Sequence, residues 1–181
     1  MTQPFIRCAS PADLGAIMSI EQAAFRSDIV ENPEVFLARI ETFDAGFLVL
    51  EHPDYQRPIA YLSSEIHHFQ PIPDRNRFDL GHDIRTSHHP EGEELYISSM
   101  ALLPEFRGQG LGNYLIAALL ERAPYRWPQL RSALLIVGDS WQAARRIYQK
   151  LGFMELTRFT DFLGSSALGQ EAVILMRRAI R

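Results

Sequence analysis

Residues 107–112 read Arg-Gly-Gln-Gly-Leu-Gly, and this stretch decides the fold. It lies between an apolar run at 95–103, which is typical of a strand, and an apolar-periodic run at 111–123, which is typical of a helix. Glycines let the backbone approach a ligand closely, and the first turn of a helix presents unpaired N–H groups at the positive end of its dipole. The stretch therefore predicts an anion site, suited to a pyrophosphate, at a strand–turn–helix junction.

The spacing Arg-x-x-Gly-x-Gly differs from both the Walker pattern and the dinucleotide pattern. Instead, residues 104–112 closely resemble the acyl-CoA-binding segment of the GNAT superfamily of N-acetyltransferases. Residues 143–153, Ala-Ala-Arg-Arg-Ile-Tyr-Gln-Lys-Leu-Gly-Phe, resemble the C-terminal helix of that family and the Leu-Gly-Phe turn after it. A glycine turn that only caps a helix would leave Arg107 and the second motif unexplained.

The resemblance implies a mixed α/β fold with a central mixed sheet of about six to seven strands, flanked by about four helices. We expect one domain over residues 1–181, because a chain of this length buries a sizeable core. The motifs are specific over residues 94–155, and the rest of the chain is compatible in its order of elements.

The remaining elements follow from periodicity and capping signals. Residues 5–8 alternate like a first strand, and Ser10-Pro11 begins a helix that carries Leu14, Ile17, Met18 and Glu21 near one face. A second helix starts at Asn32-Pro33, and residues 46–50 and 59–62 are expected to form a hairpin.

The C-terminal half follows the same logic. Residues 134–137 read as a central strand, residues 141–151 as a helix ended by Gly152, and residues 153–162 and 172–176 as closing strands.

Composition narrows the classes of function. A net charge of −4 gives no electrostatic footprint for nucleic acid. No apolar stretch approaches the roughly 20 residues of a membrane helix, and the first residues lack a signal-peptide layout. We therefore expect a cytoplasmic protein that binds neither nucleic acid nor membrane. Cys8, the single cysteine, is expected to be a small buried residue.

Residues 65–93 break the pattern. They contain three prolines, two glycines and five of the six histidines. The family has only a short connection at this place, so the resemblance makes this segment an insertion. It is either a substrate-facing lid or a solvated excursion without a role. The histidines suggest a metal, but no pair has convincing ligand spacing with a third partner, and we predict no metal site.

The resemblance assigns the donor, acetyl-CoA, to the glycine turn and to the strand before it. The family's turn amides hold the pyrophosphate, and its splayed strand binds the pantetheine arm through backbone hydrogen bonds. The corresponding residues here are Met100, Leu102, Leu103, Arg107, Gly108, Gln109, Gly110, Leu111 and Gly112. Met100, Leu102 and Leu103 are equally compatible with plain core positions. Many relatives have an asparagine where this chain has Trp141, which puts one cofactor contact in doubt.

Acyl transfer to an amine needs a general acid and a general base. Tyr148 occupies the family's tyrosine position and is predicted to be the acid, because a phenol with a pKa of about 10 can protonate a thiolate whose conjugate acid has a pKa of about 8.5. The alternative is a buried aromatic residue that packs the helix onto the sheet.

For the base, Glu94 aligns with the glutamate of the family's histone-type branch, and Tyr96 and Ser98 share its strand face. A carboxylate could remove the proton through a water held by the two hydroxyls. His88 or His89 could serve instead, and Glu94 could equally be a solvated charge at the end of a strand.

These residues predict an N-acetyltransferase that moves an acetyl group from acetyl-CoA to a primary amine by direct attack, without a covalent intermediate. Two alternatives stay open: a non-catalytic acyl-CoA sensor, and an enzyme that acetylates a protein N-terminus or lysine. Family members often form homodimers, but the sequence decides neither that question nor the acceptor.

Overall fold

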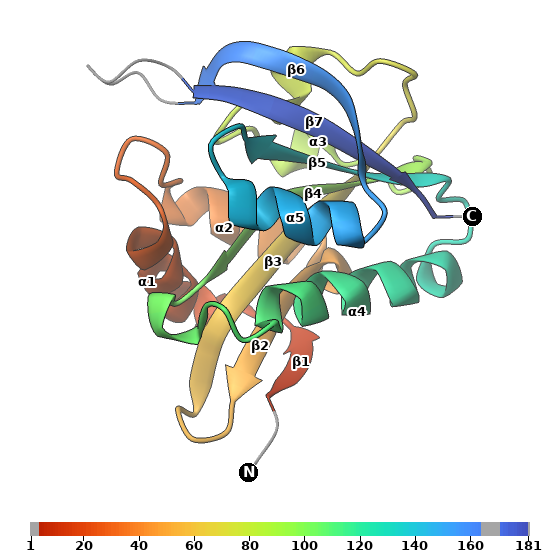
Figure 1. Cartoon of the computed structure of the whole chain (residues 1–181). Helices are drawn as coiled ribbons and strands as arrows, with labels where there is room; N and C mark the ends of the chain where they lie inside the picture. The colour runs from red at the N-terminus through yellow and green to blue at the C-terminus, as the bar shows by residue number, and fades with distance from the viewer. Residues whose placement is uncertain (1–3, 164–170, 181) are drawn as a thin grey trace.

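A single mixed sheet organises the computed structural model, which describes residues 4–163 and 171–180 (Figure 1). Its strands lie side by side in the order β1-β2-β3-β4-β5-β7-β6. Their bounds are β1 Phe5–Cys8, β2 Phe47–His52, β3 Arg57–His67, β4 Glu94–Leu102, β5 Ser132–Gly138, β6 Met154–Leu163 and β7 Glu171–Ala179. The predicted mixed α/β class with about six to seven strands is confirmed.

Neighbouring strands run antiparallel, with one exception in the middle of the sheet: β4 and β5 are parallel. A parallel pair needs a crossover, and α4 supplies it. The β2–β3 hairpin expected from the sequence is present, with its register running from Phe47 opposite Ser63 to His52 opposite Arg57.

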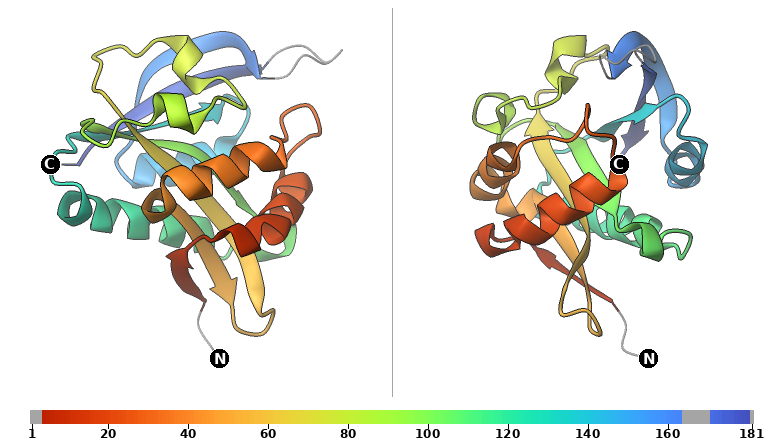
Figure 2. Two further views of the ribbon diagram at one scale, coloured as in Figure 1. Left: turned by 180° about the vertical axis from the view of Figure 1, so that it is seen from behind. Right: turned by 90° about the vertical axis from the view of Figure 1, so that its left-hand side faces the viewer.

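Helices cover both faces of the sheet. Their bounds are α1 Leu14–Ala24, α2 Pro33–Thr42, α3 Ile84–Ser87, α4 Leu111–Arg126 and α5 Gln142–Lys150, with short 3-10 helices at Pro11–Asp13, Asp44–Gly46, Arg75–Phe78 and Pro104–Phe106. The helices α1 and α2 lie on one face, and α4 and α5 lie on the other (Figures 1 and 2). Prolines at the first positions of the 3-10 turn before α1 and of α2 explain why these helices begin where the sequence predicts.

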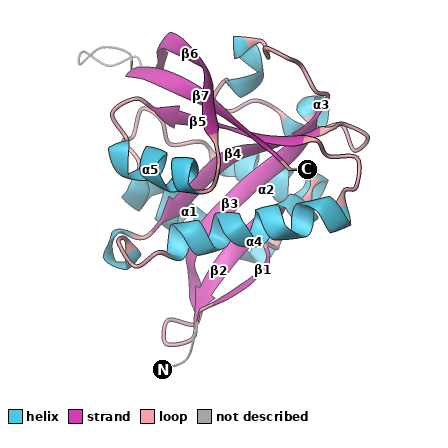
Figure 3. Cartoon of the chain, turned by 45° about the vertical axis from the view of Figure 1, so that its right-hand side comes forward, coloured by secondary structure: helices cyan, strands magenta, loops and turns pink. Residues whose placement is uncertain are grey.

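The core lies between the sheet and its two helical layers (Figure 3). Most of β2, β3 and β5 is buried because both of their faces are covered, so β2 and β5 contain continuous apolar runs, whereas the end of β3 buries the polar residues Ser63, Ser64 and Glu65. Fully buried aromatic residues, namely Phe36, Phe47, Tyr61 and Phe153, fill the space under the helices.

The predicted insertion is more ordered than its composition suggests. Residues 65–67 are the last part of β3, and the segment then forms a 3-10 helix and α3 on the α1/α2 face (Figure 2). Glu65 anchors it, since its carboxylate accepts hydrogen bonds from His82 at 2.6 Å and from Ser87 at 2.6 Å. The sequence does not show the last part of β3 as a strand, because the burial of the charged Glu65 depends on partners 17 and 22 positions further along the chain.

Cys8 corrects one expectation. It is exposed rather than buried, because β1 is the edge strand of the sheet and Cys8 is its last residue. Among the helices of residues 4–163 and 171–180, none combines the length and apolar character needed to cross a membrane.

Candidate active site

The glycine turn has the geometry expected of an anion site. Gly108 and Gly110 have φ angles of +76° and +80°, which side chains other than glycine rarely adopt. Gly110 directly precedes α4, whose first intrahelical bond is donated by the Tyr114 amide to the Gly110 carbonyl at 3.0 Å. The earlier amides of the helix therefore lack an intrahelical acceptor, and the space beside Gly110 is open.

The strand before the turn separates from its neighbour. The parallel pairing of β4 with β5 covers only Glu94–Ile97 and Ser132–Leu135, although both strands continue. A β-bulge lies at the same point, because Ser63 and Ser64 of β3 pair with Ser99 and Ile97 and leave Ser98 as the extra residue. From Ser98 onward, one side of β4 is therefore free of a partner strand.

The alternation of an antiparallel strand shows which residues of β4 turn their backbone N–H and C=O groups toward the open side. The Leu103 amide donates to the Ile59 carbonyl at 2.9 Å, so Leu103 faces β3. Alternation then turns the backbone of Met100 and Leu102 toward the gap. Gly112 lies against the side chains of the same two residues, which joins the helix N-terminus to the open strand.

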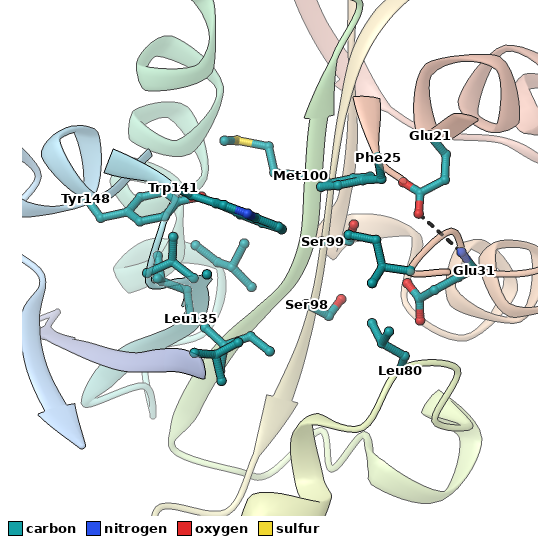
Figure 4. A pocket seen from close by; sticks show the side chains of 16 residues that line it. Glu21, Phe25, Glu31, Leu80, Ser98, Ser99, Met100, Leu135, Trp141 and Tyr148 are labelled. Carbon is teal, nitrogen blue, oxygen red and sulfur yellow. Dashed lines mark hydrogen bonds between the residues drawn. The ribbon is translucent and has the colours of Figure 1, made fainter. Parts of the chain in front are cut away.

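A pocket of about 80 Å³ occupies the gap between β4 and β5 (Figure 4). Trp141 and Tyr148 lie on one side of β4, while Glu21 and Glu31 lie on the other. Its lining consists of Glu21, Phe25, Ile29, Glu31, Leu80, Ile97, Ser98, Ser99, Met100, Leu135, Ile136, Val137, Gly138, Trp141, Tyr148 and Val173.

Tyr148 reaches this pocket from α5, as the sequence predicts for the general acid. Its ring packs edge-on against Phe153, with centroids 6.2 Å apart, which fixes its direction. Burial raises the pKa of Tyr148 to about 12. The phenol therefore holds its proton at neutral pH, as an acid that protonates a leaving thiolate must.

Glu21 is the residue that sequence reasoning missed. It projects from α1, is 1% exposed, and lines the pocket. Its carboxylate accepts a short hydrogen bond from Tyr61 and one from the Glu31 amide at 3.3 Å. The Tyr61 hydroxyl in turn lies 2.8 Å from the Ser99 hydroxyl of β4.

The environment of Glu21 suits proton transfer. Burial raises the pKa of its carboxyl, and the hydrogen bonds from Tyr61 and the Glu31 amide oppose that shift only in part. A raised carboxyl pKa moves the group toward the range useful for a base near neutral pH. The sequence contained one signal: Glu21 lies on the apolar face of its helix, where an unpaired carboxylate is uncommon.

Glu31 forms the neighbouring wall of the pocket. Arg39, which is 2% exposed, binds its two oxygens at 2.6 and 2.8 Å, and the Gly81 amide donates to it at 2.7 Å. The hydrogen bond from Gly81 to Glu31 therefore holds this turn of the insertion beside the pocket, where Leu80 contributes to the lining.

The predicted base and relay are not brought together. Glu94 is buried at the start of β4, where it accepts hydrogen bonds from Ser132 at 2.7 Å and from Arg177 at 2.8 Å. Tyr96 is buried against Phe78. Neither lines the pocket, because Glu94 is held by Ser132 and Arg177 and Tyr96 packs into a separate cluster with Phe78; only Ser98 of the three does.

The two histidines that stood as alternative bases also lie elsewhere. The ring of His88 packs on Phe43 at 4.4 Å, and that of His89 stacks on His68 at 4.5 Å. In the described part of the chain, no group of three histidine, cysteine or acidic side chains is arranged to hold a metal ion.

Trp141, the departure from the family pattern, lines the pocket. Its ring lies 5.8 Å from that of Phe25, so the two aromatic rings bridge α1 and the start of α5 across the open strands. A Cβ at position 138 would come within 2.8 Å of the indole, which explains the glycine there.

The seven-stranded mixed sheet, the gap between β4 and β5 and the glycine turn before α4 are together typical of an acetyltransferase fold. The model of the Acetyltransferase (GNAT) family matches residues 14–153, so the chain belongs to the GNAT family, as the resemblance predicted. No curated protein sequence matches the chain significantly.

Solved structures agree on the fold. The loading GNATL domain of CurA from Lyngbya majuscula has a TM-score of 0.82 at 15% identity, covering 99% of this chain and 98% of that one. The GphF GNAT-like decarboxylase in complex with isobutyryl-CoA has 0.80 at 17%, covering 98% and 100%. The ribosomal-protein-S18-alanine N-acetyltransferase from Escherichia coli has 0.69 at 21%, covering 98% and 94%.

Proposed function

We propose that the chain is an N-acetyltransferase that moves an acetyl group from acetyl-CoA to a primary amine by direct attack. One observation carries the proposal: the gap between β4 and β5 adjoins the glycine turn through Met100 and contains a buried carboxylate, Glu21, and a phenol, Tyr148. The proposed donor site, the proposed base and the proposed acid therefore all lie next to the unpaired end of β4.

The donor would be held along the open side of β4. The free amides at the start of α4 suit the pyrophosphate, and the outward-facing backbone of Met100 and Leu102 suits the amides of the pantetheine arm. The thioester would then reach the pocket that Tyr148 lines. The exposed guanidinium of Arg107 adds positive charge beside the turn.

The chemical step uses two proton transfers. The nitrogen of the neutral amine forms a bond to the acetyl carbon, the carbon–sulfur bond breaks, and the proton lost by nitrogen goes to Glu21, which then releases it to solvent. Tyr148 gives its proton to the departing CoA thiolate and regains one from solvent as the thiol leaves. The products are the N-acetylated amine and free CoA.

Glu21 takes the base role here in place of Glu94. The partner of Glu94 is the Arg177 guanidinium, whereas Glu21 has only neutral hydrogen-bond partners and lines the pocket. Tyr61 holds the carboxylate in place, and its own pKa is raised well above the ordinary value by burial and by the charge of Glu21, so it stays a donor.

The test is release of free CoA thiol from acetyl-CoA across a panel of primary amines, with calorimetry of acetyl-CoA binding in parallel. The proposal expects turnover with at least one amine, and loss of that turnover in Glu21→Gln. Acetyl-CoA binding without any turnover would favour the acyl-CoA sensor instead, and absence of binding would contradict both.

A second candidate is decarboxylation of a carboxyacyl-CoA. The observation that favours it is the higher structural similarity to the GphF GNAT-like decarboxylase, with a TM-score of 0.80, than to the alanine N-acetyltransferase, with 0.69. The pocket argues against it, since its charged lining residues are the carboxylates of Glu21 and Glu31, which would repel a substrate carboxylate. Mass spectrometry of malonyl-CoA incubated with the protein separates the two: conversion to acetyl-CoA would support the decarboxylase.

A further inference from the structure

The charged side chains that line the pocket have one sign. Among the described lining residues, Glu21 and Glu31 are the charged ones, and no lysine, arginine or histidine reaches the cavity. The acceptor therefore meets a wall that can bind a cation and, among the described residues, has no cationic side chain to bind an anion.

The two carboxylates differ in how much of their charge is neutralised. Both oxygens of Glu31 are occupied by the Arg39 guanidinium, and one also accepts the Gly81 amide. From the described residues, Glu21 accepts hydrogen bonds from a backbone amide and from the Tyr61 hydroxyl, and neither donor carries a charge. Glu21 is therefore the place where the ammonium group of an acceptor would be recognised before it loses its proton.

Apart from the hydroxyls of Ser98 and Ser99, the rest of the acceptor side is apolar. Phe25 and Ile29 follow α1, Leu80 comes from the insertion, and Trp141 closes the opposite side (Figure 4). Aromatic rings next to a carboxylate attract an ammonium group through cation–π interaction, and the aliphatic wall favours a hydrocarbon body. A polar acceptor such as an aminoglycoside would leave its hydroxyls unpaired on this wall.

The size of the cavity limits that body. Its volume of about 80 Å³ is well below the ~150 Å³ of an apolar cavity that admits benzene. This space therefore favours a short branched or linear chain over an aromatic ring.

We infer that the acceptor is a short aliphatic primary amine without a carboxylate on the carbon that bears the nitrogen. This inference rests on the proposed acetyltransferase function and adds the substrate class. An amino acid would place its carboxylate beside Glu21 in a cavity with little solvent, where like charges repel strongly.

The test compares three compounds with the same isobutyl side chain: isoamylamine, leucinamide and leucine. Isoamylamine should have a kcat/KM at least about a hundredfold above that of leucine, because like-charge contacts at a desolvated site are costly. Leucinamide keeps the bulk of leucine without its negative charge, and should fall within about tenfold of isoamylamine. Phenethylamine, tested alongside, should be slower than isoamylamine because of its ring.

Leu80 allows a matched pair of variants, since it is 45% exposed and belongs to a turn. Leu80→Arg brings a cation to the acceptor wall and should raise the kcat/KM of leucine relative to isoamylamine by about tenfold. Leu80→Gln has similar polarity without the charge, and should leave that ratio close to the wild-type value.

The outcomes separate the inference from the function beneath it. Leucine acetylated as well as isoamylamine would overturn the inference while the acetyltransferase function stands. If none of these compounds is acetylated while another amine of the panel is, the inference is overturned and the acetyltransferase function stands. If no amine of the panel is acetylated although calorimetry detects binding of acetyl-CoA, the proposed function is overturned, and the substrate class with it. The wild-type comparison decides the matter even if a Leu80 variant does not fold.

Discussion

The two ends of β4 differ in what surrounds their polar groups. At the paired end, Glu94 is enclosed by β5 and β7 and is held by Arg177 and Ser132. At the open end, Ser98, Ser99 and Met100 face a cavity, and the hydrogen bonds to the nearby carboxylate of Glu21 from described residues come from neutral groups. Both carboxylates are almost fully buried, so burial alone does not separate their proposed roles. Their hydrogen-bond partners differ, since that of Glu94 includes the charged guanidinium of Arg177.

Glu21→Gln gives the sharpest test of this comparison. The amide keeps the shape and, through its oxygen, one of the two accepted hydrogen bonds, but it accepts no proton, so kcat should fall by about 10²- to 10⁴-fold, while the Kd for acetyl-CoA changes little. Steady-state kinetics with calorimetry measures both quantities. Undiminished kcat would remove Glu21 from the mechanism and reopen the role of Glu94.

Tyr148→Phe tests the acid on the other side of the open end. Turnover should fall by about ten- to a thousandfold, because the thiolate would leave without a proton donor, while acetyl-CoA affinity stays close to the wild-type value. If Tyr148 only packs against Phe153, phenylalanine keeps that ring contact, and both kcat and the melting temperature should stay close to the wild-type values.

Glu94→Gln tests the paired end. Removing the charge leaves the Arg177 guanidinium partly buried without its counter-ion, and the free energy of unfolding should fall by about 3 kcal/mol. Urea denaturation measures this loss, and the kcat of the folded fraction should be close to that of the wild type. A large fall in kcat with unchanged stability would support Glu94 as the base.

Gly110→Val probes the donor side of the open end. Valine disfavours the φ of +80° at this position and adds bulk where the backbone must approach a pyrophosphate, so the Kd for acetyl-CoA should rise by about tenfold or more. Calorimetry measures the affinity, with Gly15→Ala, in an open position of α1, as the control. Equal affinities in both variants would refute the pyrophosphate site.

The pH profile is the finest test. Because burial raises the pKa of Glu21, the base is protonated and inactive at low pH, and kcat should increase as pH rises through that raised pKa. The rise should begin above the ordinary carboxyl range of about 4.3. Residual turnover of Glu21→Gln should lack this limb, and a limb that persists would have to belong to another group.

Much of the donor side was predictable from residues close together in the chain. The strand at 94–102, the glycine turn and the helix from Leu111 form one continuous segment, and Tyr148 lies on a helix with a clear pattern. Glu21 escaped prediction because its role depends on α1 crossing the face of the sheet near Tyr61 and Ser99, residues 40 and more positions away. The sequence favours Glu94 because its position in the strand matches the glutamate of the family's histone-type branch. Its partner Arg177 lies 83 residues further along the chain, so the ion pair that occupies Glu94 is not visible in the sequence.

The sequence by itself determined the family, the order of the elements and the anion-binding turn, because each depends on local periodicity, capping and the torsional freedom of glycine. Tertiary structure alone decided which carboxylate faces the cavity, how the insertion joins its wall through Gly81 and Glu31, and where β4 leaves β5. These features depend on charges and side chains brought together across the chain, and a hydrogen bond or an ion pair forms only where both partners arrive at the same place.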